Sequence, residues 1–525
     1  MHTPPGTDEN TPNRALLTIC LMIATLMQAL DSTIANVALP YMQGTLSTSY
    51  DQITWVLTSY VVMAAIMTAP VGWLSARFGR KNLFITCLVG FTITSMLCGL
   101  AGSLNQIVVY RLLQGAFGAA LVPLSQSTMM DIYPAAQRGT AMSIWGMGVM
   151  VGPILGPTLG GYLTANFDWR YVFFVNLPFG IAAIAGLGLL MPKIKPRSTS
   201  KFDWTGFGVL SIALSGLQIA LDRGQELDWF SSTTIIGCFI IAGLGFYLFI
   251  VHMLTARTPF IPRAVFADRN FLAALITMGS IGMVLLAASA LLAPYLENLG
   301  NYPVATAGLV MAPRGAGTMA AMLVAGRLVN RSDARLLMLA GYLMLGFSIY
   351  MQEGWTPDVS QAYIVLTIFI QGLGLGFVFV PLQVVAFYTL PAELRTQGTS
   401  LLSLVRNVGS AVGISLTSAL LSHATQYVHA DLAQFITPFS RPLQIGGAVS
   451  RLLNPATPHG AALLDSIINT QAQIIAYMDD YKFMLFSTIP AMACLLLMRH
   501  PETSHPETRH PETSQPAAAS HTAFE

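Results

Sequence analysis

One carboxylate and three guanidinium groups lie inside long apolar stretches of this chain, where charged side chains are rare. The carboxylate belongs to Asp31, and the guanidinium groups belong to Arg111, Arg314 and Arg406. A charge buried among apolar groups has to be paired, hydrated or neutralised, and a guanidinium group does not lose its proton. We therefore expect Arg111 to be the partner of Asp31.

The chemistry that Asp31 would support is proton transport. A carboxyl group that is neutral in an apolar site and ionised on contact with water carries a proton between the two. The alternative is a structural role, in which Asp31 makes a hydrogen bond that fixes its helix to a neighbour. Arg111 lies near the start of its apolar stretch, so the alternative to its pairing with Asp31 is a role as an anchor at the membrane surface.

The elements that must position these residues are membrane helices. Hydrophobic residues make up 54% of the 525 residues and charged residues 10%, and the mean hydropathy is +0.61. A membrane span needs about 20 mostly apolar residues. Fourteen such stretches predict an all-α membrane protein, and they cover residues 15–39, 53–75, 82–102, 105–130, 139–164, 170–191, 205–221, 233–254, 271–296, 304–329, 336–351, 361–390, 397–421 and 483–498.

The same composition argues against other classes of protein. The net charge is +2, and no cluster of Lys and Arg is dense enough to follow a nucleic acid backbone. The five cysteines lie in apolar stretches, which predicts neither disulfides nor a metal site. No HExxH, CxxC or GxSxG cluster suggests an enzyme, and no GxxxxGK[ST] loop suggests a nucleotide.

The basic residues predict the orientation. If the N-terminus is cytoplasmic, eighteen Lys and Arg residues fall on the cytoplasmic side and five fall outside. Cytoplasmic loops carry an excess of Lys and Arg. Since fourteen is an even number, both termini are expected in the cytoplasm.

The chain repeats itself at an offset of 254 to 257 residues. Pro40-Tyr41 matches Pro294-Tyr295, and Arg138 matches Arg395. This predicts two six-helix bundles in a parallel repeat, with two extra helices between them. The expected order is a cytoplasmic N-terminus (1–14), a first bundle (15–191), a linker with the extra spans (192–265), a second bundle (266–498) with an external loop (422–482), and a disordered tail (499–525). Within the external loop, residues 461–482 have the pattern of an amphipathic helix.

The repeat is not symmetric in charge. Leu285 and Ile368 stand where the second half would hold counterparts of Asp31 and Arg111. We therefore expect the first half to carry the proton, while both halves shape a substrate cavity. Polar or aromatic groups within the spans suit such a cavity, and the candidates are Asn36, Trp55, Tyr60, Gln126, Tyr295, Gln371 and Gln383.

The first half of the chain also contains a run of glycines between residues 145 and 163. They recur every four residues, which places them on one helix face that another helix can approach to backbone contact. Two prolines within the run predict a bent helix. Tight packing alone is the alternative to a role in moving bundles. The residues are Gly148, Gly152, Gly156 and Gly160, with Pro153 and Pro157.

Several segments resemble motifs of the major facilitator superfamily, and they follow one another in the order in which the family has them. They are GWLSARFGRK (72–81), RLLQGAFGAA (111–120) and the glycine run, which resembles the antiporter motif of proton-driven exporters. The segments LDSTIANVALP (30–40), WRYVFFVNLPFG (169–180) and INTQAQIIAYMDD (468–480), with the two extra spans, resemble the 14-span drug:proton antiporters of the EmrB/QacA type. The likeness covers about residues 14–498.

The resemblance implies roles for individual residues. Gln114 would assist Asp31 and Arg111 in proton transfer, and Gly161 would complete the antiporter motif. Ala76 stands where the family often has an acidic residue. In the family that carboxylate helps to stabilise the outward-open state through charged contacts, so its absence puts this contact in doubt here. A cytoplasmic gate would contain Gly72, Arg77, Gly79, Arg80 and Lys81.

The expected function is proton-coupled efflux of lipophilic or cationic toxic compounds across a bacterial inner membrane, by alternating access. The proton gradient would drive it without a cofactor, and the resemblance implies a periplasmic adaptor and an outer-membrane channel as partners. The alternatives are export of one endogenous metabolite, peptide or lipid on the same fold, and a membrane sensor.

Overall fold

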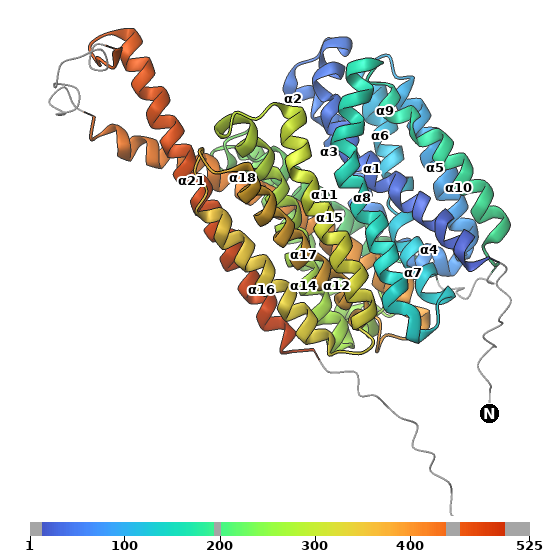
Figure 1. Ribbon diagram of the computed structural model, residues 1–525. Helices are drawn as coiled ribbons and strands as arrows, with labels where there is room; N and C mark the ends of the chain where they lie inside the picture. The colour runs from blue at the N-terminus through green and yellow to red at the C-terminus, as the bar shows by residue number, and fades with distance from the viewer. Residues whose placement is uncertain (1–12, 194–200, 437–451, 499–525) are drawn as a thin grey trace, which may run out of the picture.

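Figure 1 shows the computed structural model, which describes residues 13–193, 201–436 and 452–498. Within these ranges the chain is helical and contains no strand. Twelve helices are long and apolar enough to cross a membrane, or thirteen if a bent pair of helices is one span. Most of the expected N-terminal segment, parts of the expected linker and of the expected external loop, and the whole of the expected tail lie outside the described residues.

The first half of the chain forms one helix bundle, at the right in Figure 1. Helix α1 packs against α8 and α10, α3 packs against α6, and α5 packs against both α6 and α10. The helices are α1 (Arg14–Leu46), α2 (Tyr50–Ile53), α3 (Trp55–Thr68), α4 (Val71–Phe78), α5 (Arg80–Gly99), α6 (Leu104–Gly118), α7 (Leu121–Ile132), α8 (Arg138–Asn166), α9 (Tyr171–Phe174) and α10 (Asn176–Leu190).

The second half forms a second bundle, at the left in Figure 1. Helix α15 packs against α17, α14 against α18, and α21 against both α16 and α18. The helices are α14 (Arg269–Pro294) with a π-helical turn (Tyr295–Leu299), α15 (Val304–Leu328), α16 (Ala334–Glu353), α17 (Gln361–Ala386), α18 (Arg395–Ala433) and α21 (Pro458–Leu495). We call the end of the molecule where α1 begins and α21 ends the basal end, and the opposite end the distal end.

Polar residues just before the apolar stretches fix where several helices begin. Ser103 accepts a hydrogen bond from the backbone N–H of Gln106 at the start of α6, and Ser360 caps α17 in the same way. Asp268 caps α14. Each cap satisfies a backbone donor that the first turn of a helix leaves without a partner.

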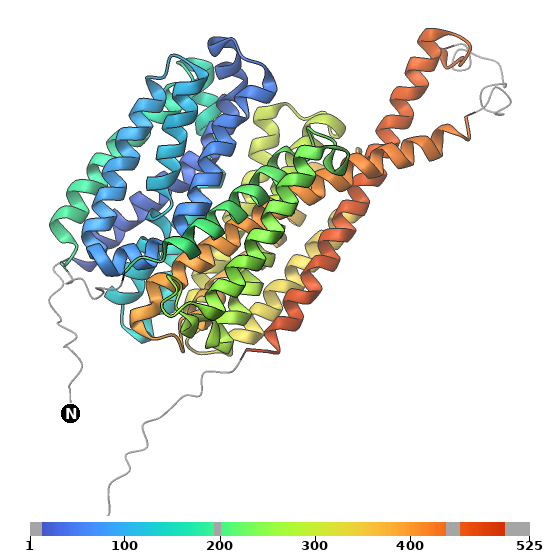
Figure 2. The same cartoon turned by 180° about the vertical axis from the view of Figure 1, so that it is seen from behind.

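The two extra helices are α11 (Trp204–Arg223) and α12 (Thr233–Thr255), drawn in shades of green in Figure 2. Helix α11 lies where the two bundles meet, and α12 packs against α11. Helix α11 contacts α3 of the first bundle and α18 of the second. Thr58 donates a hydrogen bond to the Asp222 carboxylate, and Ser415 donates one to the Leu221 carbonyl at 2.7 Å. The distal end of α11 therefore joins both halves.

The amphipathic segment 461–482 and most of the apolar stretch 483–498 lie on one continuous helix, which is longer than a single membrane span. Helix α18 continues past residue 421 to Ala433, and α21 begins at Pro458, so both extend beyond the distal end as an arm in Figure 1. The apolar stretch 483–498 supplies only the basal part of α21. This helix is not among those that pass as membrane-spanning by length and composition.

Candidate functional site

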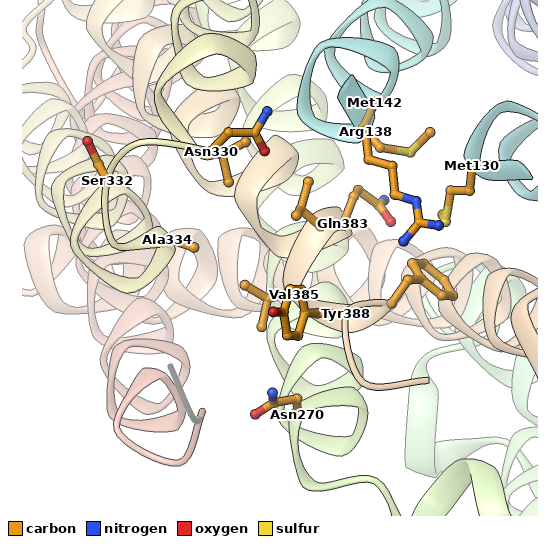
Figure 3. Close-up of a pocket in the computed structure, with 13 residues that line it drawn as sticks. Met130, Arg138, Met142, Asn270, Asn330, Ser332, Ala334, Gln383, Val385 and Tyr388 are labelled. Carbon is orange, nitrogen blue, oxygen red and sulfur yellow. The ribbon is translucent and has the colours of Figure 1, made fainter. Parts of the chain in front are cut away.

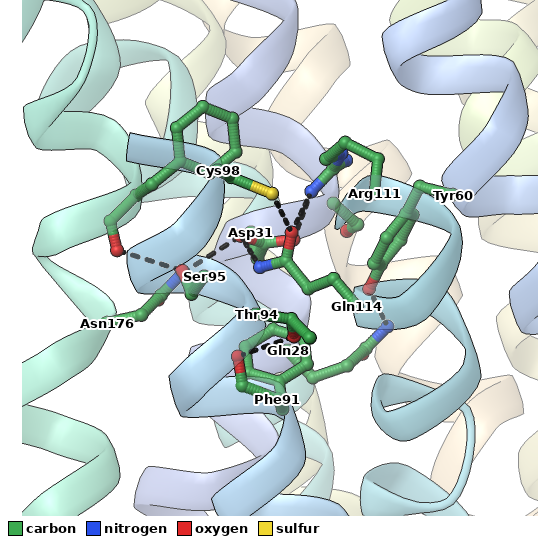
Figure 4. A network of polar contacts seen from close by, with 12 residues as sticks. Gln28, Asp31, Tyr60, Phe91, Thr94, Ser95, Cys98, Arg111, Gln114 and Asn176 are labelled. Carbon is green, nitrogen blue, oxygen red and sulfur yellow. Dashed lines mark hydrogen bonds and ion pairs between the residues drawn. The ribbon is translucent and has the colours of Figure 1, made fainter. Parts of the chain in front are cut away.

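Asp31 lies at the centre of a polar network inside the first bundle, shown in Figure 4. Arg111 donates from Nη1 to Asp31 Oδ2 at 2.7 Å, which makes a salt bridge between side chains that are 1% and 0% exposed. Gln114 and Asn176 each donate an amide N–H to Asp31 Oδ1, both at 2.9 Å. Three donors from two other helices thus surround the carboxylate.

Further contacts hold these donors in place. Arg111 Nη1 also donates to Gln114 Oε1 at 2.8 Å, and Arg111 Nε donates to the Val56 carbonyl at 3.1 Å. Asn176 donates to Ser95 Oγ at 3.0 Å. The guanidinium carbon lies 4.1 Å from the centre of the Tyr60 ring, a cation–π contact. Asp31 is therefore connected to α3, α5, α6 and α10.

This arrangement suits an ionised carboxylate in an apolar interior. Asp31, Arg111 and Gln114 are each 0% exposed, so the pair is shielded from water. Protonation of Asp31 would remove the negative charge that balances Arg111 and weaken three hydrogen bonds at once. A neutral Asp31 would therefore interact less strongly with the surrounding helices than an ionised one.

The glycine run lies on α8, on the side that faces α1. A Cβ atom at Gly152 would lie 2.5 Å from Ala29 Cβ and 2.8 Å from the Leu30 nitrogen, and one at Gly156 would lie 2.9 Å from Thr33 Cβ. Glycine is thus needed for this separation of the helices. Gly148 and Gly160 face α1 as well, whereas a Cβ at Gly161 would have an ordinary contact, and Pro153 and Pro157 are exposed within a continuous helix.

The opposite side of α8 packs against α15 of the second bundle. A Cβ atom at Gly315 would meet Ile154, and one at Gly139 would lie 2.7 Å from the Gly326 carbonyl. Helix α8 therefore lies between α15 and α1, the helix that carries Asp31. A movement of α1 has a direct route to the contact between the two halves.

At the basal end, charged residues join the two halves. Asp131 at the end of α7 accepts from Arg80 at 2.5 Å and from Arg395, at the start of α18, at 2.8 Å. Arg80 also donates to Thr396 Oγ1 at 3.1 Å. Although Ala76 lacks a carboxylate, Arg80 therefore has an acidic partner in Asp131, and a charged contact between the halves exists.

The other expected gate residues differ in what they contact. A Cβ atom at Gly72 would lie 2.9 Å from the Gln397 Cα of the second half, so this glycine allows close contact. Gly79 has a φ of 83° between α4 and α5, a conformation that suits glycine. Lys81 donates to the Gly188 and Met191 carbonyls within the first half, and Arg77 is exposed.

The seven expected cavity residues are not gathered in one place. Gln126 of α7 donates to Gln383 of α17 at 2.5 Å, which joins the two halves. Tyr60 belongs to the Asp31 network. The others lie apart: Tyr295 packs against Trp355, Gln371 donates to Gln352 at 3.5 Å inside the second bundle, and Asn36 and Trp55 are exposed.

A pocket of about 290 Å³ opens between the two halves at the basal end, shown in Figure 3. Arg138 and Met142 of α8 line one side, and Gln383 and Tyr388 line the other. Thr399 donates to the Pro123 carbonyl and Asn330 to the Ala136 carbonyl, at 3.1 and 2.7 Å. These two hydrogen bonds, like the Gln126–Gln383 bond and the contacts of Arg80 and Arg395, join the two bundles in this basal part.

Two buried polar residues were missed by the sequence reasoning. Asn176 is 0% exposed and binds Asp31, and its signal was a lone amide within the apolar stretch 170–191. Asp480 in α21 is 1% exposed, so its acidic side chain is buried, as that of Asp31 is. It lies just before the apolar stretch 483–498, so the sequence placed it in the external loop.

Comparisons with known proteins agree with this architecture. A family profile described as the Major Facilitator Superfamily matches residues 21–414. The multidrug export protein EmrB of Escherichia coli is 35% identical over 430 residues, covering 81% of this chain and 83% of EmrB. The fatty acid resistance protein FarB of Neisseria gonorrhoeae is 36% identical over 433 residues, covering 82% and 85%.

A solved structure shows the same fold. The proton:xylose symporter XylE, a transporter of the same superfamily, aligns with a TM-score of 0.56 at 15% sequence identity. The alignment covers 89% of this chain and 95% of that one. At this identity the likeness concerns the arrangement of the helices.

Proposed function

The chain belongs to the Major Facilitator Superfamily, in the EmrB-type branch of multidrug exporters, and from this we propose that it exports lipophilic toxic compounds in exchange for protons. Its relatives carry the names multidrug export protein and fatty acid resistance protein. The fold has two bundles with a pocket between them, as alternating access requires.

The observation that carries the proposal is the buried Asp31–Arg111 pair. Intramembrane ionisable residues are costly and commonly mark ion pathways. In the structure the Asp31 carboxyl group is paired with Arg111 and shielded from water. We propose that a proton from outside reaches Asp31 when the distal side opens, and that its release to the cytoplasm restores the pair.

The coupling would pass through α8. Protonation of Asp31 weakens its bonds to α6 and α10, so that α1 becomes free to shift. Because the glycines of α8 hold it at backbone contact with α1, this shift would move α8 against α15. The two bundles would then rock, and the basal contacts through Asp131 would open or close.

The energetics are sufficient without a nucleotide or other cofactor. One proton that crosses a membrane potential of about 150 mV yields roughly 3.5 kcal/mol. Since about 1.4 kcal/mol corresponds to a tenfold ratio, one proton could sustain a roughly 300-fold gradient of an uncharged compound. The proton gradient is therefore the proposed energy source.

We place the basal end in the cytoplasm, with both termini there, in a bacterial inner membrane. The bias of Lys and Arg toward this side supports the orientation. The distal arm of α18 and α21 would then project into the periplasm. Tyr427 on this arm is 77% exposed and offers a contact for a periplasmic adaptor, which we propose as a partner together with an outer-membrane channel.

A susceptibility panel tests the function. Expression in an efflux-deficient bacterial host is expected to raise the minimal inhibitory concentration of several unrelated lipophilic compounds. The Asp31→Asn variant, present in the membrane at the same level, is expected to give no protection. Protection by the variant equal to that of the wild type would overturn the role of Asp31, and protection against no compound would favour a narrow metabolite exporter.

A further inference from the structure

Arg406 differs from the other two intramembrane arginines because the described residues give its guanidinium group no partner. Arg111 is paired with Asp31, and Arg314 donates to Ser289 Oγ and to the Leu285 carbonyl, at 2.7 and 2.8 Å. Within residues 13–193, 201–436 and 452–498, no hydrogen bond or ion pair engages the Arg406 side chain. An unpaired arginine at this depth calls for a partner from outside the chain.

Arg406 faces a narrow space between the two bundles. Gln126 and Trp145 of the first bundle line this space, and Met278, Gln383, Leu402 and Ser403 of the second bundle complete it. The lining thus combines one cation with three polar side chains and three apolar ones. This is the composition of a site that binds an amphipathic molecule with one charged group.

The space around Arg406 adjoins the basal pocket of Figure 3. Gln383 lines both, so its hydrogen bond to Gln126 stands at their junction. The basal pocket contains a second arginine, Arg138, for which the described residues likewise provide no hydrogen bond or ion pair, and its buried Nε atom has no partner. Asp131, a nearby carboxylate, is already bound by Arg80 and Arg395.

We propose that Arg406 binds the acid group of lipophilic organic anions, and that Arg138 attracts them at the basal mouth of the same path. This deepens the proposed export function and rests on it, because it names a substrate class for the space between the halves. The apolar body of the substrate would pack against Trp145 and Met278. The amides of Gln126 and Gln383 would exchange their mutual bond for bonds to the acid.

The charge balance favours an anion over a cation at this position. A guanidinium group keeps its charge at any physiological pH, and Asp31 already neutralises Arg111. A bound carboxylate or sulfonate would satisfy Arg406 with charge-assisted hydrogen bonds, whereas a cationic drug would add a second positive charge. In this conformation the space has no room for a ligand, so the substrate would enter only when the two halves part.

The test compares two probes with the same aromatic body. Anilinonaphthalene sulfonate carries a permanent negative charge, and phenylnaphthylamine is its uncharged parent. Both become fluorescent in apolar sites, so their dissociation constants can be measured with the full-length protein in nanodiscs, after subtraction of empty nanodiscs. Charge-assisted hydrogen bonds are worth roughly a tenfold to hundredfold change in affinity.

The Arg406→Gln variant is expected to bind the sulfonate at least tenfold more weakly and the uncharged parent within twofold of wild type. Arg406→Lys should restore most of the sulfonate binding, because it keeps the charge. Arg327→Gln is the matched control, since Arg327 is an exposed arginine of α15 outside both spaces, and it should bind both probes normally.

Equal losses for both probes in Arg406→Gln would overturn the proposal, because they would show a general effect on the fold. Unchanged sulfonate binding would overturn it as well. Neither result would touch the proposed export function, which the susceptibility panel and Asp31→Asn test separately. If wild-type protein protects cells but does not distinguish the two probes, export stands and the anion subsite fails.

Discussion

The contact between α8 and α1 permits a substitution of one methyl group with a large expected effect. In Gly152→Ala, the new Cβ atom would lie 2.5 Å from Ala29 Cβ and 2.6 Å from the Ala29 carbonyl carbon, whereas ordinary contacts begin at 3.4 Å. Because backbone atoms of α1 block the way, a side-chain rotation cannot relieve the clash. The two helices must separate locally by about 0.9 Å, the difference between these distances.

The expected cost follows from this separation. Forcing an extra methyl group into a packed interior costs typically about 1–3 kcal/mol. Leu30 and Asp31 follow Ala29 directly, so the displaced segment carries the carboxylate whose hydrogen bond to Arg111 is 2.7 Å long. Gly152→Ala should therefore lower both the unfolding temperature and proton-driven transport.

Gly161→Ala is the matched control on the same helix. Its Cβ atom would lie 3.9 Å from Val37 Cγ1, an ordinary contact. Both substitutions exchange glycine for alanine within α8, so any gain from the higher helix propensity of alanine, about 1 kcal/mol, is shared. Thermal unfolding in detergent and transport in proteoliposomes should separate the two variants, and identical behaviour in both assays would refute the packing argument.

Three further predictions concern the polar contacts. Asp31→Asn alone leaves Arg111 buried without a counter-charge and should lower the free energy of unfolding by about 3–5 kcal/mol. Asp31→Asn combined with Arg111→Gln should regain much of that loss, as measured by chemical unfolding. A double variant no more stable than the single one would contradict this. Asp131→Asn removes the ion pairs of Asp131 with Arg80 and Arg395. Since partly exposed pairs contribute about 1 kcal/mol or less, labelling of a cysteine placed in the basal pocket should accelerate by roughly fivefold. The control Asp168→Asn, which breaks a pair with Arg170 within the first half, should leave the labelling rate unchanged. Gln383→Leu leaves the buried amide of Gln126 unsatisfied, which should cost about 1–3 kcal/mol and lower the unfolding temperature, and an unchanged temperature would show that the amide finds another partner.

The sequence was sufficient for much of the architecture because membrane helices leave a strong signal in composition. Each of the fourteen apolar stretches lies on one helix or, as for residues 53–75, on two consecutive helices. The glycine spacing indicated close helix packing. The amphipathic pattern of residues 461–482 predicted a helix there. It did not predict that this helix runs without a break into the apolar stretch 483–498 and packs against α16 and α18.

The candidate site was predictable only where a charge stood out against an apolar background. Asp31 and Arg111 were visible for that reason, and they meet in the structure. Asn176 was not singled out, because an amide in an apolar stretch has many possible partners. The polar groups expected in one cavity are spread over several sites, since sequence position within a span does not tell which helix face a side chain occupies.

Proton-driven movement of a permanently charged probe tests the central claim most directly. Proteoliposomes with an acidic lumen would be given ethidium or anilinonaphthalene sulfonate outside, neither of which follows a pH gradient by its own protonation. We expect wild-type protein to accumulate at least one of them in the lumen only while the gradient lasts, and the Asp31→Asn, Arg111→Gln double variant, folded and still binding that probe, to accumulate none. Gradient-driven accumulation by the double variant at the wild-type rate, or no accumulation of either probe by folded wild-type protein, would contradict the account.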